Sequence, residues 1–309
     1  IFDINQEKAA YKEVIFGIQL ARDGLINGAA SKGSELPFYF QPNTRNGICG
    51  NLPLGKGGGT IRVHPWFYDL YSTGDYAKDG KLDFRTDFSF LTRWDGSTNA
   101  TPSLPRRYIT YPVIEPDAPD LVREQQPYVD KYKDPGGKDS RNHENDLFII
   151  RLAEVYLIKA EALNELGRTS EAYEPFNKLR QRARMANGTP RAVPLDLVPG
   201  LSKENFRLAI FNERGLELLA EGQRWFDATR MRYLNTDKSM MQWRYDTFYP
   251  SLPATAKVLP FWNTGTKAWT VGKAQPINII AWNDRYKLFP IPSNELDANT
   301  NFGVQNPGW

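Results

Sequence analysis

The sequence predicts a mostly α-helical fold with long irregular loops, in which tetratricopeptide-like αα-hairpins pack against a loop-rich region with short strands. Three observations support this prediction. Apolar residues recur at helical spacing between positions 147 and 233. The residues before about 145 are rich in Gly and Pro and hold few long periodic patterns. The chain has 309 residues, 40% of them hydrophobic, which is enough to bury a large core without disulfides.

The charge balance and the cysteine count exclude several classes of protein. The 39 basic and 36 acidic residues are scattered, so the chain lacks the electrostatic footprint of a nucleic-acid-binding protein. Cys49 is the only cysteine, which excludes an intrachain disulfide, and we interpret it as an idle or buried thiol. No run of about 18 apolar residues predicts a transmembrane helix. Since Ile1 is not preceded by a leader, we expect a processed chain or a piece of a longer protein.

The first part, residues 1–145, starts with a helix-like stretch that runs into the alternating, strand-like "EVIFGIQL". The glycine-rich loop "NTRNGICGNLPLGKGGGTIR" follows, without the residue pattern of a phosphate-binding loop. The next stretch, "HPWFYDLY", is predicted to form a short helix because Pro65 suits the first helical turn. Phe67, Leu70 and Tyr71 would share one face of that helix and pack inward.

The middle part, residues 146–235, is predicted to form two helical hairpins. Its first helix, "RLAEVYLIKAEALNELG", has two apolar stripes, which predict packing neighbours on two sides. The stripes are Leu152, Tyr156, Ala160 and Leu163, and Val155, Ile158, Ala162 and Leu166. Gly167 suits the turn to the returning helix "EAYEPFNKLRQRARMA". Ser202 is predicted to cap a third helix that runs to Gly222 and is followed by "QRWFDATRMRYL".

The last part, residues 236–309, is predicted to be irregular, with its tryptophans spread through loops. These are Trp243, Trp262, Trp269 and Trp282. No repeat period extends over the whole chain, so we expect residues 1–309 to form a single domain with helical hairpins only in its middle part.

The strongest charged pattern lies in the third helix, where Glu213, Glu217 and Glu221 follow one another at steps of four. Paired carboxylates suit a glycosidase, but carboxylates stacked on one helix face repel each other. Arginines lie three residues from the carboxylates, at Arg214 before Glu217, Arg224 after Glu221 and Arg230 after Asp227. Because a neighbouring arginine lowers the pKa of a carboxyl group, we predict an ion-pair lattice that locks helices rather than a catalytic pair.

After the glutamates, His143 is the second residue that could belong to a functional site, because histidine is a common metal ligand. It lacks a second histidine at i+4, and the acidic residues around it do not match a calcium-binding loop. These residues are Asp134, Asp139, Glu144 and Asp146. We interpret them as solvated loop charges and expect no metal and no cofactor.

Four segments together resemble the SusD/RagB family of outer-membrane nutrient-binding lipoproteins. They are "RLAEVYLIKAEALNELG", "FNKLRQRARMANG", "NERGLELLAEGQRWFDATRMR" and "LFPIPSNELDANTNFGVQNPGW", and they occur in the family's order. The first half fits through "HPWFYDLYSTGDYAKDGKLDFRTDFSF", with Asp83 and Arg85 in an Asp-x-Arg pattern. The resemblance covers the C-terminal part of a family member.

The resemblance implies a protein that is not an enzyme. It implies a surface-exposed lipoprotein of the outer membrane, lipid-anchored in the full-length protein, which captures oligosaccharide for a SusC-like TonB-dependent transporter. Two alternatives stay open at this point. One is a peptide-binding uptake subunit of the same family, and the other is a glycoside hydrolase. A helical adaptor that binds only protein would instead bury its loop aromatic residues.

The candidate binding residues are aromatic, because a sugar presents an apolar face that packs on flat rings. The chain has 13% aromatic residues. Trp66 and Tyr68 lie off the inward face of their helix, and Trp66 follows the glycine-rich loop directly. We predict that the site in residues 1–145 contains Trp66, Tyr68, Trp94 and Tyr39, with loop amides such as that of Asn46 bonding the hydroxyls.

Overall fold

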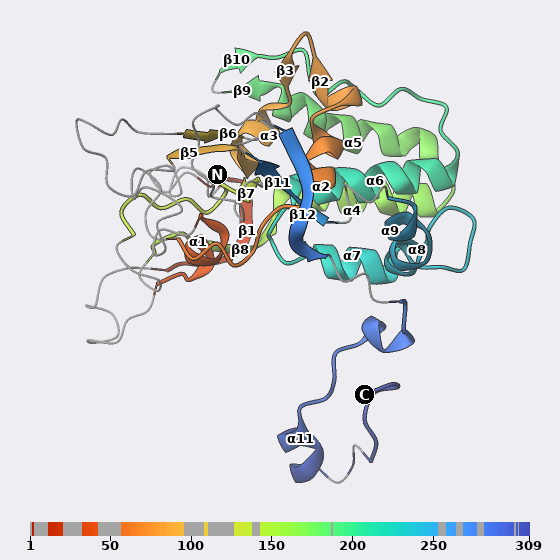
Figure 1. Ribbon diagram of the computed structural model, residues 1–309. Helices are drawn as coiled ribbons and strands as arrows, with labels where there is room; N and C mark the ends of the chain where they lie inside the picture. The colour runs from red at the N-terminus through yellow and green to blue at the C-terminus, as the bar shows by residue number, and fades with distance from the viewer. Residues whose placement is uncertain are drawn as a thin grey trace, which may run out of the picture.

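The computed structural model describes residues 2, 12–20, 33–42, 57–95, 108–110, 127–137, 143–186, 188–252, 258–263, 268–276, 281–299, 301 and 303–309 (Figure 1). The helices are α1 (Leu36–Phe40), α2 (Pro65–Tyr71), η3 (Gly74–Tyr76), α3 (Phe84–Ser89), α4 (Leu152–Glu165), α5 (Thr169–Ala183), α6 (Lys203–Glu217), α7 (Arg224–Arg230), α8 (Met240–Trp243), η4 (Arg244–Phe248), α9 (Tyr249–Ser251), η5 (Asp284–Lys287) and α11 (Ser293–Ala298). Long helices thus dominate the middle of the chain, as predicted.

The strands are short and pair two by two. They are β1 (Val14–Ile18), β2 (Ala77–Lys78), β3 (Lys81–Leu82), β4 (Phe90–Leu91), β5 (Arg93–Asp95), β6 (Tyr108–Thr110), β7 (Tyr128–Val129), β8 (Leu147–Arg151), β9 (Met185–Ala186), β10 (Thr189–Pro190), β11 (Val258–Asn263) and β12 (Ala268–Pro276). The antiparallel pairs are β1–β8, β2–β3, β4–β7, β5–β6, β9–β10 and β11–β12. In Figure 1, α4, α5 and α6 lie side by side, and the segment with α11 extends away from them.

Helices α4 and α5 form the first predicted hairpin. The turn between them requires a left-handed residue, and Gly167 supplies it with a φ of 77°. The Arg168 N–H then donates to the carbonyl of Leu163 at 2.9 Å. A core forms between α4, α5 and α6, and its fully buried members include Leu157, Ala160, Ala172, Phe176, Phe206, Ile210 and Phe211. The first predicted apolar stripe is only partly correct. Ala160 is buried and Tyr156 and Leu163 are half-buried, but Leu152 is 38% exposed, and the buried face of α4 includes Leu157, which belongs to neither predicted stripe.

Helix α6 ends earlier than predicted. Ser202 caps its start, with Oγ accepting the Asn205 N–H at 3.2 Å. The helix stops at Glu217, because the chain then turns through Ala220, which has a left-handed φ of 63°. The prediction that three glutamates stack on one helix face is therefore wrong for Glu221, which lies in the turn.

The second apolar stripe of α4 is exposed in the described part of the chain. Val155, Ile158 and Leu166 are 40%, 49% and 73% exposed. The prediction of packing neighbours on two sides is thus wrong for this face, because α4 contributes Ala153, Leu157 and Ala160 to the core instead.

Two further predictions are wrong. Trp262 and Trp269 lie opposite each other on β11 and β12 rather than in loops, and Trp243 ends α8. The acidic residues near His143 are not all solvated, since Asp134 is 1% exposed and accepts backbone N–H groups, and His143 itself is fully buried. Satisfied backbone donors explain why this carboxylate is buried. No helix among the described residues is both long and apolar enough to cross a bilayer.

Candidate ligand-binding site

The short helix α2 forms as predicted, and His64 fixes its first turn. Pro65 occupies the first helical position, and the His64 Nδ1 accepts the backbone N–H of Trp66 at 3.3 Å. Burial lowers the pKa of His64 to about 4, so the imidazole is neutral at pH 7 and its nitrogen can accept. The cap holds the backbone of Trp66, the first predicted site residue.

One face of α2 packs into a second core, as predicted. Tyr71 is fully buried, and its ring meets that of Phe67 edge-on with centroids 5.1 Å apart. The Tyr71 hydroxyl donates to the carbonyl of Asn212 on α6. Leu70 is partly buried against the same core. This packing fixes α2 on α6 and directs Trp66 to another side of the helix.

Trp66 is half-buried and packs on rings from a distant segment. Its centroid lies 5.2 Å from that of Phe248 and 6.2 Å from that of Tyr249, both in edge-on geometry. These rings come from η4 and α9, and η4 is a π-helix. Such turns are rare and occur frequently at functional sites. The structure therefore joins α2 to the segment 240–251.

The rings continue beyond Trp66 and form what we call the aromatic cluster. It consists of Trp66, Trp243, Tyr245, Phe248, Tyr249, Trp282 and Tyr286, all half-buried. Tyr245 links the two ends, with centroids 5.6 Å from Tyr249 and 6.0 Å from Tyr286. Six of these seven rings were not predicted as site residues. The dense aromatic stretch "MMQWRYDTFYP" is the sequence signal that could have indicated four of the six.

The structure places the other predicted site residues away from this cluster or does not describe them. Tyr39 is 36% exposed on α1 and donates to the Glu35 carboxylate at 3.0 Å. The ring of Tyr68 packs edge-on against Phe90 at 5.3 Å. Trp94 lies on β5, where its backbone faces Ile109, but its side chain is outside the described part. Asn46 lies outside the described residues altogether.

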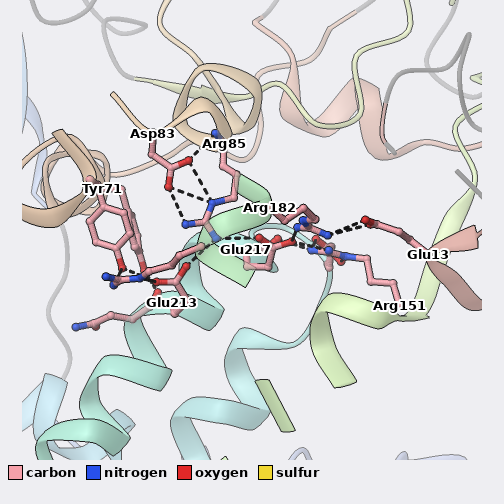
Figure 2. A network of polar contacts seen from close by, with 12 residues as sticks. Glu13, Tyr71, Asp83, Arg85, Arg151, Arg182, Glu213 and Glu217 are labelled. Atoms are coloured by element: carbon pink, nitrogen blue, oxygen red, sulfur yellow. Dashed lines mark hydrogen bonds and ion pairs between the residues drawn. The ribbon is translucent and has the colours of Figure 1, made fainter. Parts of the chain in front are cut away.

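The glutamates of the helical region form the predicted ion-pair lattice, and Figure 2 shows its centre. Glu217 contacts the guanidinium groups of Arg85, Arg151 and Arg182 at 2.9, 2.6 and 2.6 Å. Glu213 contacts Arg85 at 2.7 Å and Arg180 at 2.9 Å. The lattice connects α6 to α3, α5 and β8.

The arginine partners predicted from spacing are mostly wrong. Glu221 pairs with Lys131 and with Arg151, both at 2.7 Å, rather than with Arg224. Arg214 pairs with Asp227 at 2.6 Å rather than with Glu217. Only the pair of Arg230 with Asp227, at 2.8 Å, is confirmed. One reason is that α6 ends before Glu221, so Glu221 and Arg224 do not share a helix. The other is that the fold brings cations and carboxylates from distant elements, which compete with the partners three residues away.

The lattice holds its glutamates in the ionised form. Burial alone would raise the pKa of Glu217, but Arg182, Arg151 and Arg85 outweigh it and hold this pKa well below the ordinary value. The same competition lowers the pKa of Glu213 and of Glu221. A general acid needs a raised pKa near the working pH, so these carboxylates are unsuited to glycosidase chemistry.

We expect the chain to lose stability in acid. A glutamate with a lowered folded-state pKa stabilises the fold above its unfolded pKa of about 4.3, and this contribution is lost as the pH falls through the folded value. Glu213, Glu217 and Glu221 all act in this direction, and so does His64 below about pH 6.5. Burial raises the pKa of Asp83, which opposes them. In urea unfolding, the free energy of unfolding should fall from pH 7 to pH 5 and again to pH 4. Equal free energies of unfolding at pH 7 and pH 4 would contradict this expectation.

Comparison with known proteins identifies the family. A profile described as the SusD family matches residues 12–309. SusD-like protein P2 from Formosa agariphila is 32% identical over 180 residues, which are 58% of this chain and 29% of that protein. SusD-like protein P38 from the same organism is 35% identical over 130 residues, which are 42% of this chain and 25% of that protein.

Solved structures share the fold. A SusD homolog from Bacteroides thetaiotaomicron matches with a TM-score of 0.67 at 21% identity, over 100% of this chain and 56% of that one. Surface glycan-binding protein A from the same organism, in complex with laminarihexaose, matches with a TM-score of 0.53 at 20% identity, over 95% of this chain and 52% of that one. The chain spans about half of the length of these structures and less of the curated relatives. The matched range of the family profile, nearly the whole chain, shows that the protein belongs to the SusD family.

Proposed function

We propose that this chain is part of a non-catalytic glycan-binding subunit that captures oligosaccharide at the outer-membrane surface for a SusC-like TonB-dependent transporter. The observation that supports this most strongly is the half-exposed aromatic cluster around Trp66. The helical region beside it holds the carboxylates of Glu213, Glu217 and Glu221 in ion pairs. The family membership agrees with it, and a related structure holds laminarihexaose.

The aromatic cluster offers the chemistry that a sugar needs. Half-buried Trp and Tyr rings present flat apolar faces and lose little conformational entropy, because they have only two rotatable bonds and are fixed by their neighbours. Trp66 is fixed from two sides, by the His64 cap on its backbone and by Phe248 on its ring. Such a preorganised ring binds a sugar face at a lower entropic cost than a mobile one.

A binding survey tests the proposal. The chain would be run by affinity electrophoresis through gels that contain one polysaccharide each, and in parallel titrated with peptide mixtures. Retention by at least one polysaccharide, without release of shortened sugars, supports a non-catalytic glycan-binding protein. Binding of peptides alone would favour the peptide-binding alternative, and release of shortened sugars would favour a hydrolase.

A pull-down with the lipid-anchored full-length protein tests the proposed partner. Recovery of a large outer-membrane barrel protein is the expected result. A preparation that binds glycan but recovers no such barrel would contradict the transporter part of the proposal while leaving glycan binding in place.

A further inference from the structure

Two neighbouring arginines, Arg224 and Arg244, stand outside the ion-pair lattice of the described residues, and Arg244 lies over Trp66. Arg224 begins α7, and its guanidinium lies 3.6 Å from the centroid of the Phe211 ring. It donates to the Phe211 carbonyl, while its Nη2 is buried without a hydrogen-bond partner among the described residues. Arg244 begins η4 and lies over Phe211 as well, at 5.1 Å. The two cations therefore share one ring.

Arg244 also belongs to the candidate binding site. Its guanidinium lies 5.1 Å from the Trp66 centroid and 5.8 Å from that of Phe248. Its Nε is buried and has no hydrogen-bond partner in the part of the chain that the structure describes. The side chain as a whole is half-buried, so part of it reaches the surface beside the aromatic cluster.

The neighbouring lattice has no spare negative charge for these arginines. Its buried carboxylates and buried cations are equal in number, and each of these side chains is at most 10% exposed. They are Asp83, Glu213, Glu217 and Glu221, and Arg85, Lys131, Arg151 and Arg180. The carboxylate that acts on Arg224 is that of Asp227, and its two oxygens already contact Arg214 and Arg230 at 2.6 and 2.8 Å.

Two neighbouring cations without a carboxylate partner among the described residues are unfavourable. Burial and, to a smaller extent, the nearby Arg244 lower the pKa of Arg224 to about 10, against the opposing effect of Tyr71. Arg224 is nevertheless charged at pH 7. An anion placed next to Arg244 would relieve this repulsion, and the planar fork of a guanidinium fits the paired oxygens of a carboxylate or sulfate group.

We propose that Arg244, with the half-buried Arg224 beside it, forms an anion subsite next to Trp66, so that the ligand is a glycan bearing carboxylate or sulfate groups. The inference rests on the proposed glycan binding and adds the class of sugar. A sugar ring on Trp66 would place its acidic substituent at Arg244, since the two side chains are in contact. Arg224 would not touch the ligand and would add to the positive potential.

The test compares acidic and neutral polysaccharides in the affinity gels. The acidic set contains polygalacturonate, alginate and chondroitin sulfate, and the neutral set contains laminarin, starch and xylan. We expect retention by an acidic polysaccharide that weakens at 300 mM NaCl. Arg244→Gln should weaken it at least about tenfold, the loss typical of a charge-assisted hydrogen bond. Arg244→Lys keeps the positive charge but lacks the planar guanidinium, so it should weaken retention less than Arg244→Gln.

Arg232→Gln is the matched control. This arginine lies between α7 and α8, and its side chain is 68% exposed. The substitution should leave retention unchanged, and thermal melts of all variants report on folding. Retention by neutral polysaccharides only, or equal retention of Arg244→Gln and the parent chain, would overturn the anion subsite and leave glycan binding intact. Retention by no polysaccharide would overturn the proposed function and this inference with it.

Discussion

Glu217→Gln should lower the free energy of unfolding by about 3–5 kcal/mol, the loss typical when one partner of a buried ion pair is removed. The side chain of Glu217 is 3% exposed and contacts the guanidinium groups of Arg85, Arg151 and Arg182. Glutamine keeps the shape and loses the charge, so three guanidinium groups face one another around an uncharged amide. Urea unfolding at pH 7 measures the effect.

The control for this variant is Glu165→Gln. Glu165 also contacts an arginine, Arg207, at 2.5 Å, but its side chain is 38% exposed. Solvent screens such pairs, and the expected loss is about 0–1 kcal/mol. Equal effects of both substitutions would contradict the buried lattice. The same Glu217→Gln protein serves a second purpose, because loss of a measurable hydrolytic activity in a still-folded variant would support the glycosidase alternative.

Trp66→Ala should weaken glycan binding by at least about thirtyfold, which corresponds to the roughly 2 kcal/mol or more of a buried aromatic hot spot. The substitution removes the ring that joins α2 to Phe248 and Tyr249, and with it the proposed stacking face. Isothermal titration calorimetry with a glycan retained in the gels gives the affinity.

Trp225→Ala is the matched control, since Trp225 is equally half-buried but stacks on Phe289 at 4.7 Å, outside the aromatic cluster. It should change the affinity less than about threefold while losing similar packing. A Trp66→Ala protein that melts like the Trp225→Ala protein and binds like the parent chain would place the binding site elsewhere.

Local patterns predicted the helical hairpins well. The left-handed Gly167 and the Ser202 cap depend on residues close in sequence, and both behave as expected. The buried face of α4 was predicted only in part, since Leu152 is exposed and Leu157 is buried. The end of α6 was missed because Ala220, a residue with no turn preference, adopts the left-handed region that usually needs glycine. The division into parts at 145 and 235 remains a prediction.

The candidate site was predicted only in part, because its contacts are long-range. Trp66 could be chosen from its place on α2, but its ring partner Phe248 is 182 positions away in the sequence numbering. The spaced glutamates predicted that an ion-pair lattice exists, but they did not predict its partners. Its main cations, Arg85 and Arg151, come from elements far from α6 in sequence. Periodicity and spacing report on neighbours within one helix and carry no signal about such pairs.

A crystal structure of the chain with a retained oligosaccharide tests the central claim most directly. We predict a sugar ring packed on the face of Trp66, with carbon atoms within about 4.0–4.5 Å of the indole, and the helical ion-pair lattice unchanged. A ligand bound elsewhere, with Trp66 covered only by Phe248 and Tyr249, would contradict the account.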